Sequence, residues 1–103
     1  MYIKYKITYD PAKHRRNVLT RGLSFELVMQ FDWHGALIRR DERHEYGESR
    51  YCALGYIQHR LFSLVFTPRD GAVHVISLRK ANSREVNRYE KALENIATRP
   101  GQS

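Results

Sequence analysis

The sequence lacks several features that define large classes of protein. Only one of its 103 residues is cysteine, so no disulfide can form within the chain and the fold does not depend on an oxidising compartment. No basic-then-apolar leader opens the chain, and no apolar run approaches the roughly 20 residues that span a bilayer. We therefore expect one intracellular domain over residues 1–97, followed by a flexible tail over 98–103.

Patterns typical of metal and nucleotide sites are also missing. The histidines form no HxH, HExxH or Cys–His pairing, and no glycine-rich phosphate loop occurs. The segment 41–45 gathers carboxylates around His44, but arginines alternate with them and would oppose a bound cation. A solvated loop with local ion pairs is the simpler interpretation. We predict no metal site and no cofactor.

Positive charge is what the sequence has in excess. The formal net charge is +7 and the isoelectric point is about 9.9. Such an excess informs about partners more than about fold, and nucleic acid is the first candidate, followed by an anionic membrane or an acidic protein. The alternative is a soluble basic protein whose charge has no specific partner.

The order of apolar patterns predicts an α+β fold. An alternating run predicts an N-terminal strand over 2–9, and Asp10 with Pro11 predicts a helix that ends near Gly22. Ser24 caps a second short helix over 25–31. Four predicted strands follow, which are 36–40, 50–57, 60–67 and 72–79. A charged, polar loop over 41–49 joins the first two, and short turns join the others. Strands joined by such short links pair antiparallel, so we predict an antiparallel sheet.

A cluster of cations lies where the last predicted strand meets the last helix. Asn82 and Glu85 have the spacing of a capping box, and the apolar stripe of the helix predicts that it packs on the sheet. The strand ends in Arg79 and Lys80, which must point to opposite faces, so only one readily joins a given site. The helix adds cations that share one face and suit RNA or plain solvation: Arg84, Arg88 and Lys91.

The polar segment 41–50 holds the side chains that RNA cleavage needs. The 2′-hydroxyl of RNA attacks the neighbouring phosphate when a base removes its proton, a cation stabilises the transition state and an acid protonates the leaving oxygen. Glu48 or His44 can move protons, and the fork of Arg50 matches phosphate oxygens. Glu48 can equally act as an ion-pair partner that positions Arg50. This chemistry requires no metal.

The motifs occur in an order that resembles a known family. The N-terminal pieces are Ile7-Thr8-Tyr9-Asp10-Pro11-Ala12-Lys13, Gly22-Leu23-Ser24-Phe25-Glu26 and Phe31-Asp32. The more specific pieces follow, as Tyr46-Gly47-Glu48-x-Arg50 and Ile76-Ser77-x-Arg79-Lys80-Ala81, with Glu85 and Tyr89 after them. Together they cover nearly the whole chain and resemble the BrnT family of toxins.

This resemblance implies a RelE-like fold and an endoribonuclease toxin of a bacterial type II toxin–antitoxin module. Such a toxin cuts RNA without a metal, inhibits translation and acts in the cytoplasm, away from membranes. A BrnA-like ribbon-helix-helix antitoxin would neutralise it in a hetero-oligomer that represses its own operon, reaching operator DNA through the antitoxin. The residues that carry over are Glu48, Arg50, Arg79 and Lys80, with His44 and Tyr89 as further catalytic candidates.

Two departures from the family pattern motivate an alternative function. Arg21 stands where the family usually has histidine, and His74 stands where it often has arginine, which removes one cation from the sheet. The alternative is a catalytically weak binding module that acts only with an antitoxin in transcriptional autoregulation.

Overall fold

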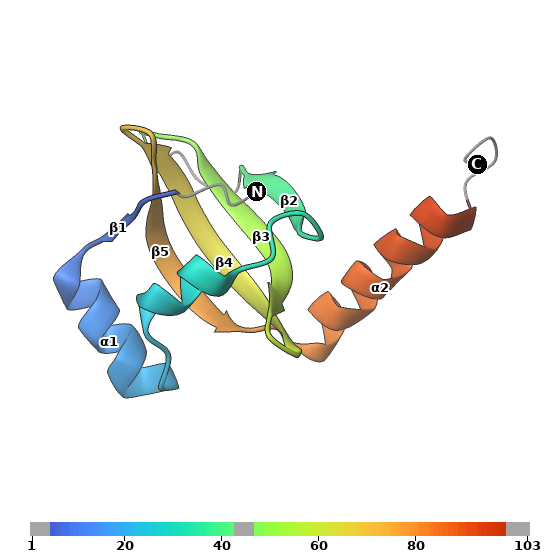
Figure 1. Cartoon of the computed structure of the whole chain (residues 1–103), viewed down its shortest axis with the longest axis horizontal. Coiled ribbons are helices and arrows are strands. Elements are labelled where there is room, and N and C mark those ends of the chain that lie inside the picture. Colours follow the sequence, from blue (N-terminus) through green and yellow to red (C-terminus); the bar gives the residue numbers. More distant parts are fainter. Residues whose placement is uncertain (1–4, 43–46, 99–103) are drawn as a thin grey trace.

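The computed structural model describes residues 5–42 and 47–98, which form a five-stranded sheet flanked by helical segments (Figure 1). The elements are β1 (Ile7–Tyr9), α1 (Pro11–Arg21), the 3-10 helix η1 (Phe25–Gln30), β2 (Leu37–Asp41), β3 (Arg50–Ile57), β4 (Arg60–Arg69), β5 (Ala72–Lys80) and α2 (Ser83–Thr98). The strands lie in the order β1-β5-β4-β3-β2. The α+β class is therefore as predicted, and β3 has the predicted bounds.

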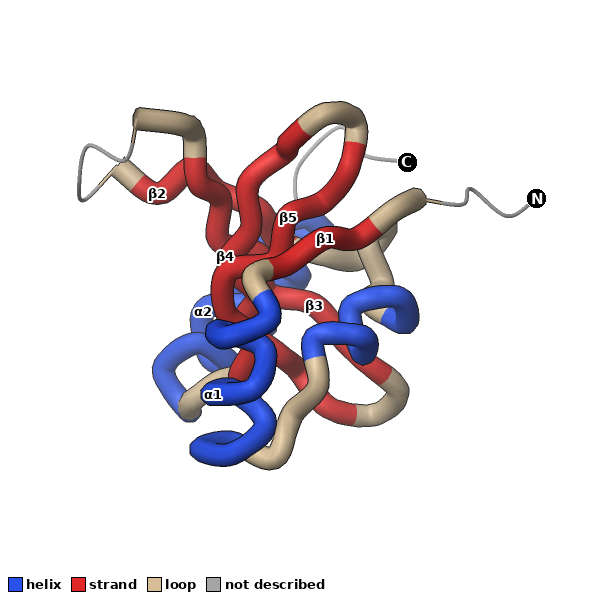
Figure 2. Tube along the Cα trace, turned by 90° about the vertical axis from the view of Figure 1, so that its left-hand side faces the viewer, coloured by secondary structure: helices blue, strands red, loops and turns tan. Residues whose placement is uncertain are grey.

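The sheet is mixed, which corrects the prediction of an antiparallel sheet. Strands β2 to β5 form an antiparallel meander, but β1 pairs parallel with β5, with Thr8 opposite His74 (Figure 2). The prediction rested on short turns, and these constrain only strands that follow one another along the chain. Nearly the whole domain separates β1 from β5, so no tight turn sets their relative direction.

Helix α1 continues along the edge of β5 beyond the end of β1. Asp10 caps its first turn through a bond from the Ala12 N–H at 2.8 Å, and Gly22 ends it in the left-handed conformation with φ of 68°. The buried side chain of Asn17 then donates to two main-chain carbonyls, of Leu23 and Leu78, each at 3.0 Å. Asn17 thus fixes α1 to the uncovered edge of β5.

One face of the sheet, here called the covered face, carries the main core. Ser24 caps η1, as predicted, and η1 lays Phe25 and Val28 against this face, where both are almost fully buried. The sheet side of this core includes Ala53, Phe62, Leu64, Val75 and Leu78. The positions between these residues therefore point to the opposite face, here called the open face.

A β-bulge in β5 changes which residues reach the open face. Val65 of β4 pairs with Ser77, and Phe66 pairs with Val75, so Ile76 is an extra residue in β5. Val75 and Leu78 consequently both point into the core although they are three positions apart. The bulge also places His74 and Arg79 together on the open face, which strict alternation would not allow.

Helix α2 contacts the sheet only near its beginning, which corrects the prediction that it packs on the sheet. Val86 and Tyr89 join a second small core with Leu54 and Leu61. The helix then extends away from the strands (Figure 1), and Ile96 is 61% exposed. The far half of α2 therefore leaves apolar side chains exposed, with Leu93 at 48% as well.

The position of Asn17 leads to a test of the fold. Asn17→Ala removes the side-chain donor that binds the carbonyls of Leu23 and Leu78, and the bond to Leu78 is buried. A buried polar group left without a partner costs about 1–3 kcal/mol. We expect urea unfolding to show a loss of stability of that order. Asn87→Ala, on the exposed surface of α2, is the matched control and should change the free energy of unfolding by less than about 0.5 kcal/mol. Equal losses in the two variants would contradict the role given to Asn17.

Candidate functional site

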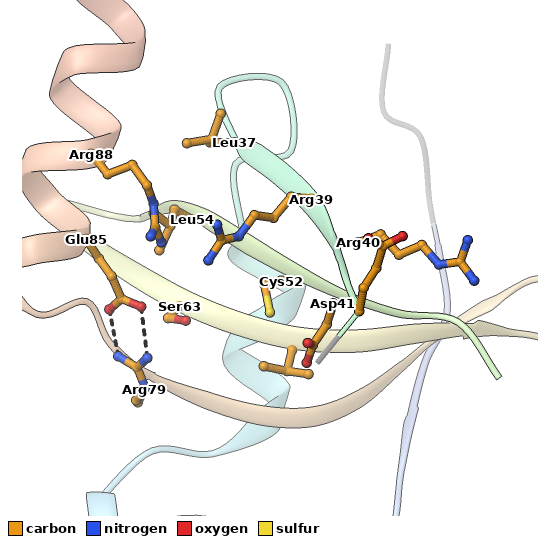
Figure 3. A pocket seen from close by; sticks show the side chains of 12 residues that line it. Leu37, Arg39, Arg40, Asp41, Cys52, Leu54, Ser63, Arg79, Glu85 and Arg88 are labelled. Carbon is orange, nitrogen blue, oxygen red and sulfur yellow. Dashed lines mark hydrogen bonds and ion pairs between the residues drawn. The ribbon is translucent and has the colours of Figure 1, made fainter. Parts of the chain in front are cut away.

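An open groove of about 430 Å³ lies between the open face and α2 (Figure 3). Its walls combine charged side chains with a small apolar floor, and they are Leu37, Arg39, Arg40, Asp41, Glu42, Cys52, Leu54, Ser63, Val65, Arg79, Glu85 and Arg88. The register explains this set, because Leu54 pairs with Ser63 and Ser63 with Arg79, which places them in one row across the sheet. The next row contains Arg39, Cys52 and Val65.

Arg79 is held in the groove by a bidentate ion pair. Its Nη1 and Nη2 donate to the two carboxylate oxygens of Glu85 at 2.7 and 2.9 Å. This bond and the charge of Glu85 raise the pKa of Arg79, and the bond from Arg79 lowers the pKa of Glu85. Glu85 also accepts from the Asn82 N–H at 3.0 Å while Asn82 caps Glu85 in return, so the predicted capping box is confirmed. Arg79 is thus oriented by the first turn of α2.

Two further arginines reach the same groove. In Figure 3, Arg39 from β2 and Arg88 from α2 point toward one another above the floor formed by Cys52 and Ser63. Arg40 points away from the Arg79–Glu85 pair in the same view. The groove therefore offers several guanidinium groups from three elements, which is a surface suited to phosphate.

A second polar cluster lies at the other end of the open face. Arg69 donates from Nη2 to Glu48 at 2.6 Å, and its Nη1 lies 3.1 Å from Nε2 of His74. The other ring nitrogen of His74 lies 2.8 Å from the hydroxyl of Thr8. Burial, with help from the charge of Arg69, lowers the pKa of His74. Arg69, from the adjacent strand, places a cation beside His74 in this cluster.

The residues predicted to be catalytic are divided between these two clusters. Arg79 lies in the groove, whereas Glu48 pairs with Arg69, and Arg50 begins β3 in the same row as His74. Four residues of β4 separate the row of Arg79 from the row of His74, or roughly 13 Å at about 3.3 Å per residue. Glu48 and Arg79 therefore do not converge on one atom.

Other predicted residues lie away from both clusters. Lys80 lines a separate hollow with Leu27 and Phe62, on the side of the sheet opposite Arg79, as strand alternation predicts. Tyr89 is buried, and its hydroxyl donates to the Gly35 carbonyl at 2.6 Å, so here it anchors the turn before β2. His44 lies outside the described residues. Of the three helix cations, Arg88 reaches the groove, while Arg84 and Lys91 are exposed.

Sequence reasoning missed three participants. Arg39 had a usable signal, because pairing of β2 with β3 sets it opposite Cys52 on the open face. Arg69 was treated only as part of a turn, and Glu85 as part of a capping box and of the family motif but not as the partner of Arg79. The pairing of Arg69 with Glu48 joins positions 21 residues apart, which a local pattern does not contain. Arg79 and Glu85 are six residues apart, and their pairing depends on how α2 turns away from the end of β5.

The described part of the chain contains neither a cluster of metal ligands nor a helix that could span a membrane. In residues 5–42 and 47–98, no group of three or more His, Cys, Asp or Glu side chains is arranged to hold a metal ion. None of the helices in these segments combines the length and the apolar character that crossing a membrane requires.

The lowered pKa of His74 predicts a dependence of stability on pH. As the pH falls through 6.5, the ordinary pKa of histidine, the unfolded chain takes up a proton at this residue before the folded protein does. The free energy of unfolding should therefore decrease on acidification, until the lower folded pKa is passed. His74→Gln removes this contribution. Urea unfolding between about pH 7.5 and pH 5.5 should show a larger loss for the wild type, and parallel curves would contradict the assignment.

Comparison with known proteins places the chain in a family. A comparison with curated proteins gave no significant match. A solved structure, the 1.1 Å crystal structure of the Brucella abortus ribonuclease toxin BrnT, is similar, with a TM-score of 0.62 and 25% sequence identity over 78% of this chain and 100% of that one. The family described as "Ribonuclease toxin, BrnT, of type II toxin-antitoxin system" matches residues 9–85. The chain therefore belongs to the BrnT family of ribonuclease toxins.

Proposed function

We propose that this toxin is a metal-independent endoribonuclease that cuts RNA lying on the open face and thereby inhibits translation. The observation that carries the proposal is Arg79, held by Glu85 in a groove that Arg39 and Arg88 also line. The net charge of +7 draws RNA toward such a surface. The fold and the chemistry are those of a RelE-like toxin.

Arg79 has the geometry to stabilise a transition-state phosphate. A guanidinium has five N–H donors, and Arg79 uses three of them, two toward Glu85 and one toward the Lys80 carbonyl at 3.3 Å. The Nε–H and the second Nη2–H make no hydrogen bond within the described residues, and the side chain is 39% exposed. These two parallel donors match two phosphate oxygens. Glu85 fixes their direction before RNA arrives, which is the basis of electrostatic catalysis.

The proton-transfer groups belong to the segment before and at the start of β3. Glu48 and His44 are the candidates for moving protons, and Tyr89 is the remaining candidate. Arg50 lies on the open face two residues after Glu48. Glu48 is engaged by Arg69 at 2.6 Å, so it acts as a base only after that bond opens. Lys80 lies on the other side of the sheet and would bind RNA outside the groove.

The partner of this toxin is an antitoxin, since the family belongs to type II modules. We propose a BrnA-like antitoxin with a ribbon-helix-helix portion, bound in a hetero-oligomer in the bacterial cytoplasm. The complex would reach operator DNA through the antitoxin and repress its own operon. Arg84 and Lys91, exposed on α2 next to Arg88, would steer RNA to the free toxin.

The alternative is a binding module with weak catalysis that acts only with the antitoxin. Its support is that both Glu48 and Arg79 are paired with opposite charges in this structure. An RNA phosphate must then compete with Glu85, or use the donors that Glu85 leaves. The two functions differ in one measurement, the cleavage of RNA by the toxin alone.

Cleavage in the presence of EDTA tests the proposed function. Purified wild-type toxin should cut a single-stranded RNA with EDTA present, because its proposed groups need no metal. Arg79→Gln should lower the rate constant for cleavage by about 10²-fold or more, the scale of losing one oriented donor to a transition-state oxyanion. Lys80→Gln should have a much smaller effect, because Lys80 lies on the other side of the sheet.

Arg15→Gln supplies the matched control, since it removes the same charge from the exposed surface of α1. If the wild type leaves RNA intact in EDTA but cuts it with added magnesium, metal independence is wrong. If the toxin cuts under neither condition yet binds operator DNA together with an antitoxin, the alternative function is correct.

A further inference from the structure

We propose that Arg69 forms a second phosphate-binding subsite, which grips the RNA backbone at the end of the open face remote from Arg79. The inference rests on the proposed function to the extent that the ligand is a single strand of RNA. It concerns a residue that lies outside the resemblance motifs and outside the groove. The ligand at this subsite is a phosphodiester of the same strand whose other end meets Arg79.

Three separate parts of the chain fix the position of Arg69. Glu48, in the segment before β3, accepts from Nη2 at 2.6 Å, and His74 of β5 lies 3.1 Å from Nη1. Thr8 of β1 in turn holds the His74 ring at 2.8 Å. A long side chain near a turn is ordinarily free to rotate, but here its guanidinium is held from two sides. Because the side chain of Arg69 is already ordered in the free protein, binding a ligand costs little further side-chain entropy.

The donor and acceptor roles in these bonds show that Arg69 carries the positive charge of the cluster and that His74 is uncharged. The guanidinium can only donate, so Nε2 of His74 must accept, and the ring proton then lies on Nδ1, facing the Thr8 hydroxyl. The ring is neutral in this arrangement. Arg69 retains three N–H donors beyond these two bonds, and its side chain is 45% exposed. Those donors are available to an incoming phosphate.

The two held arginines share one face at a distance that a short single strand can cross. The backbone of Arg69 lies six residues along β4 from the row of Arg79, or roughly 20 Å at about 3.3 Å per residue. Its guanidinium contacts His74, whose row is only roughly 13 Å from that of Arg79. Arg39 lies on the open face in a row between these ends, and Arg50 lies at the end that contains His74. A strand laid along this path therefore meets cations throughout. A duplex would instead present a wide rigid surface, so the spacing favours single-stranded RNA.

The rival interpretation is that the cluster only ties β1, the turn after β4 and the segment before β3 together. Both interpretations predict some loss of stability on mutation. They differ in how binding depends on RNA length, because only a two-point grip requires a strand that reaches from Arg79 to Arg69. The length dependence of affinity therefore separates a ligand subsite from a structural tie.

The experiment measures binding of 2′-O-methyl single-stranded RNA oligonucleotides of increasing length by fluorescence anisotropy. This RNA cannot be cut by attack of its 2′-hydroxyl. Wild-type affinity should rise in a step once the oligonucleotide reaches both arginines. Arg69→Gln should remove that step, lower the affinity only for the longer oligonucleotides, and reduce the slope of log affinity against log salt by about 0.7. Arg15→Gln, with the same loss of charge, should keep the step.

Arg69→Lys serves as the second variant, since it keeps the charge but not the fork, and should retain part of the step. A melting curve for each variant shows whether it is folded at the temperature of the binding measurement, and only folded variants are compared. A step that persists in Arg69→Gln, or equal losses in Arg69→Gln and Arg15→Gln, would overturn the proposal. A toxin that shows the step but cuts no RNA would refute the cleavage function and leave the subsite in place.

Discussion

One extra residue in β5 determines where the functional side chains lie. Without the bulge at Ile76, strict alternation would put His74 and Arg79 on opposite faces, because their positions differ by an odd number. Leu78 would likewise leave the core, where it is fully buried. The carbonyl of Leu78 is also the one that Asn17 binds. The bulge therefore reconciles two demands, a continuous core on one face and the placement of both His74 and Arg79 on the other.

Each arginine at the two ends of the open face is held by its own glutamate. The Arg69–Glu48 pair is exposed on both sides, and such a pair contributes about 0–1 kcal/mol, so a phosphate can compete for its guanidinium. The Arg79–Glu85 pair is bidentate and Glu85 is only 13% exposed, so a phosphate there uses the donors that Glu85 leaves. The cost is that each pair is locally neutral. Attraction toward RNA then comes from the remaining positive charge, which totals +7 over the chain. Orientation and attraction are thus supplied by different residues.

Much of the fold could be predicted from local signals. Asp10, Ser24 and the pair Asn82 and Glu85 all cap helices as their spacing indicated, and the tight turns predicted the antiparallel order of β3, β4 and β5. The direction of β1, the bulge and the departure of α2 from the sheet could not be predicted, because each depends on contacts between distant segments. The site shared this limit. The residue types in 41–50 and at Arg79 predicted RNA cleavage. The pairing of Glu48 with Arg69 could not be predicted without knowing how the strands pair in the sheet.

The geometry changes how the two specific motifs are understood. Tyr46-Gly47-Glu48-x-Arg50 leads into β3 at one end of the open face, and Ile76-Ser77-x-Arg79-Lys80-Ala81 closes β5 at the other. The backbone rows of the two motifs are roughly 13 Å apart, and Glu48 and Arg79 are each held in their own ion pair, so in this arrangement they do not act on one phosphate. Either the RNA strand bends so that cleavage occurs at one end while the other end holds the backbone, or the chain moves on binding. The two held arginines favour the first arrangement, because a side chain that is already oriented loses its advantage if the site must rearrange.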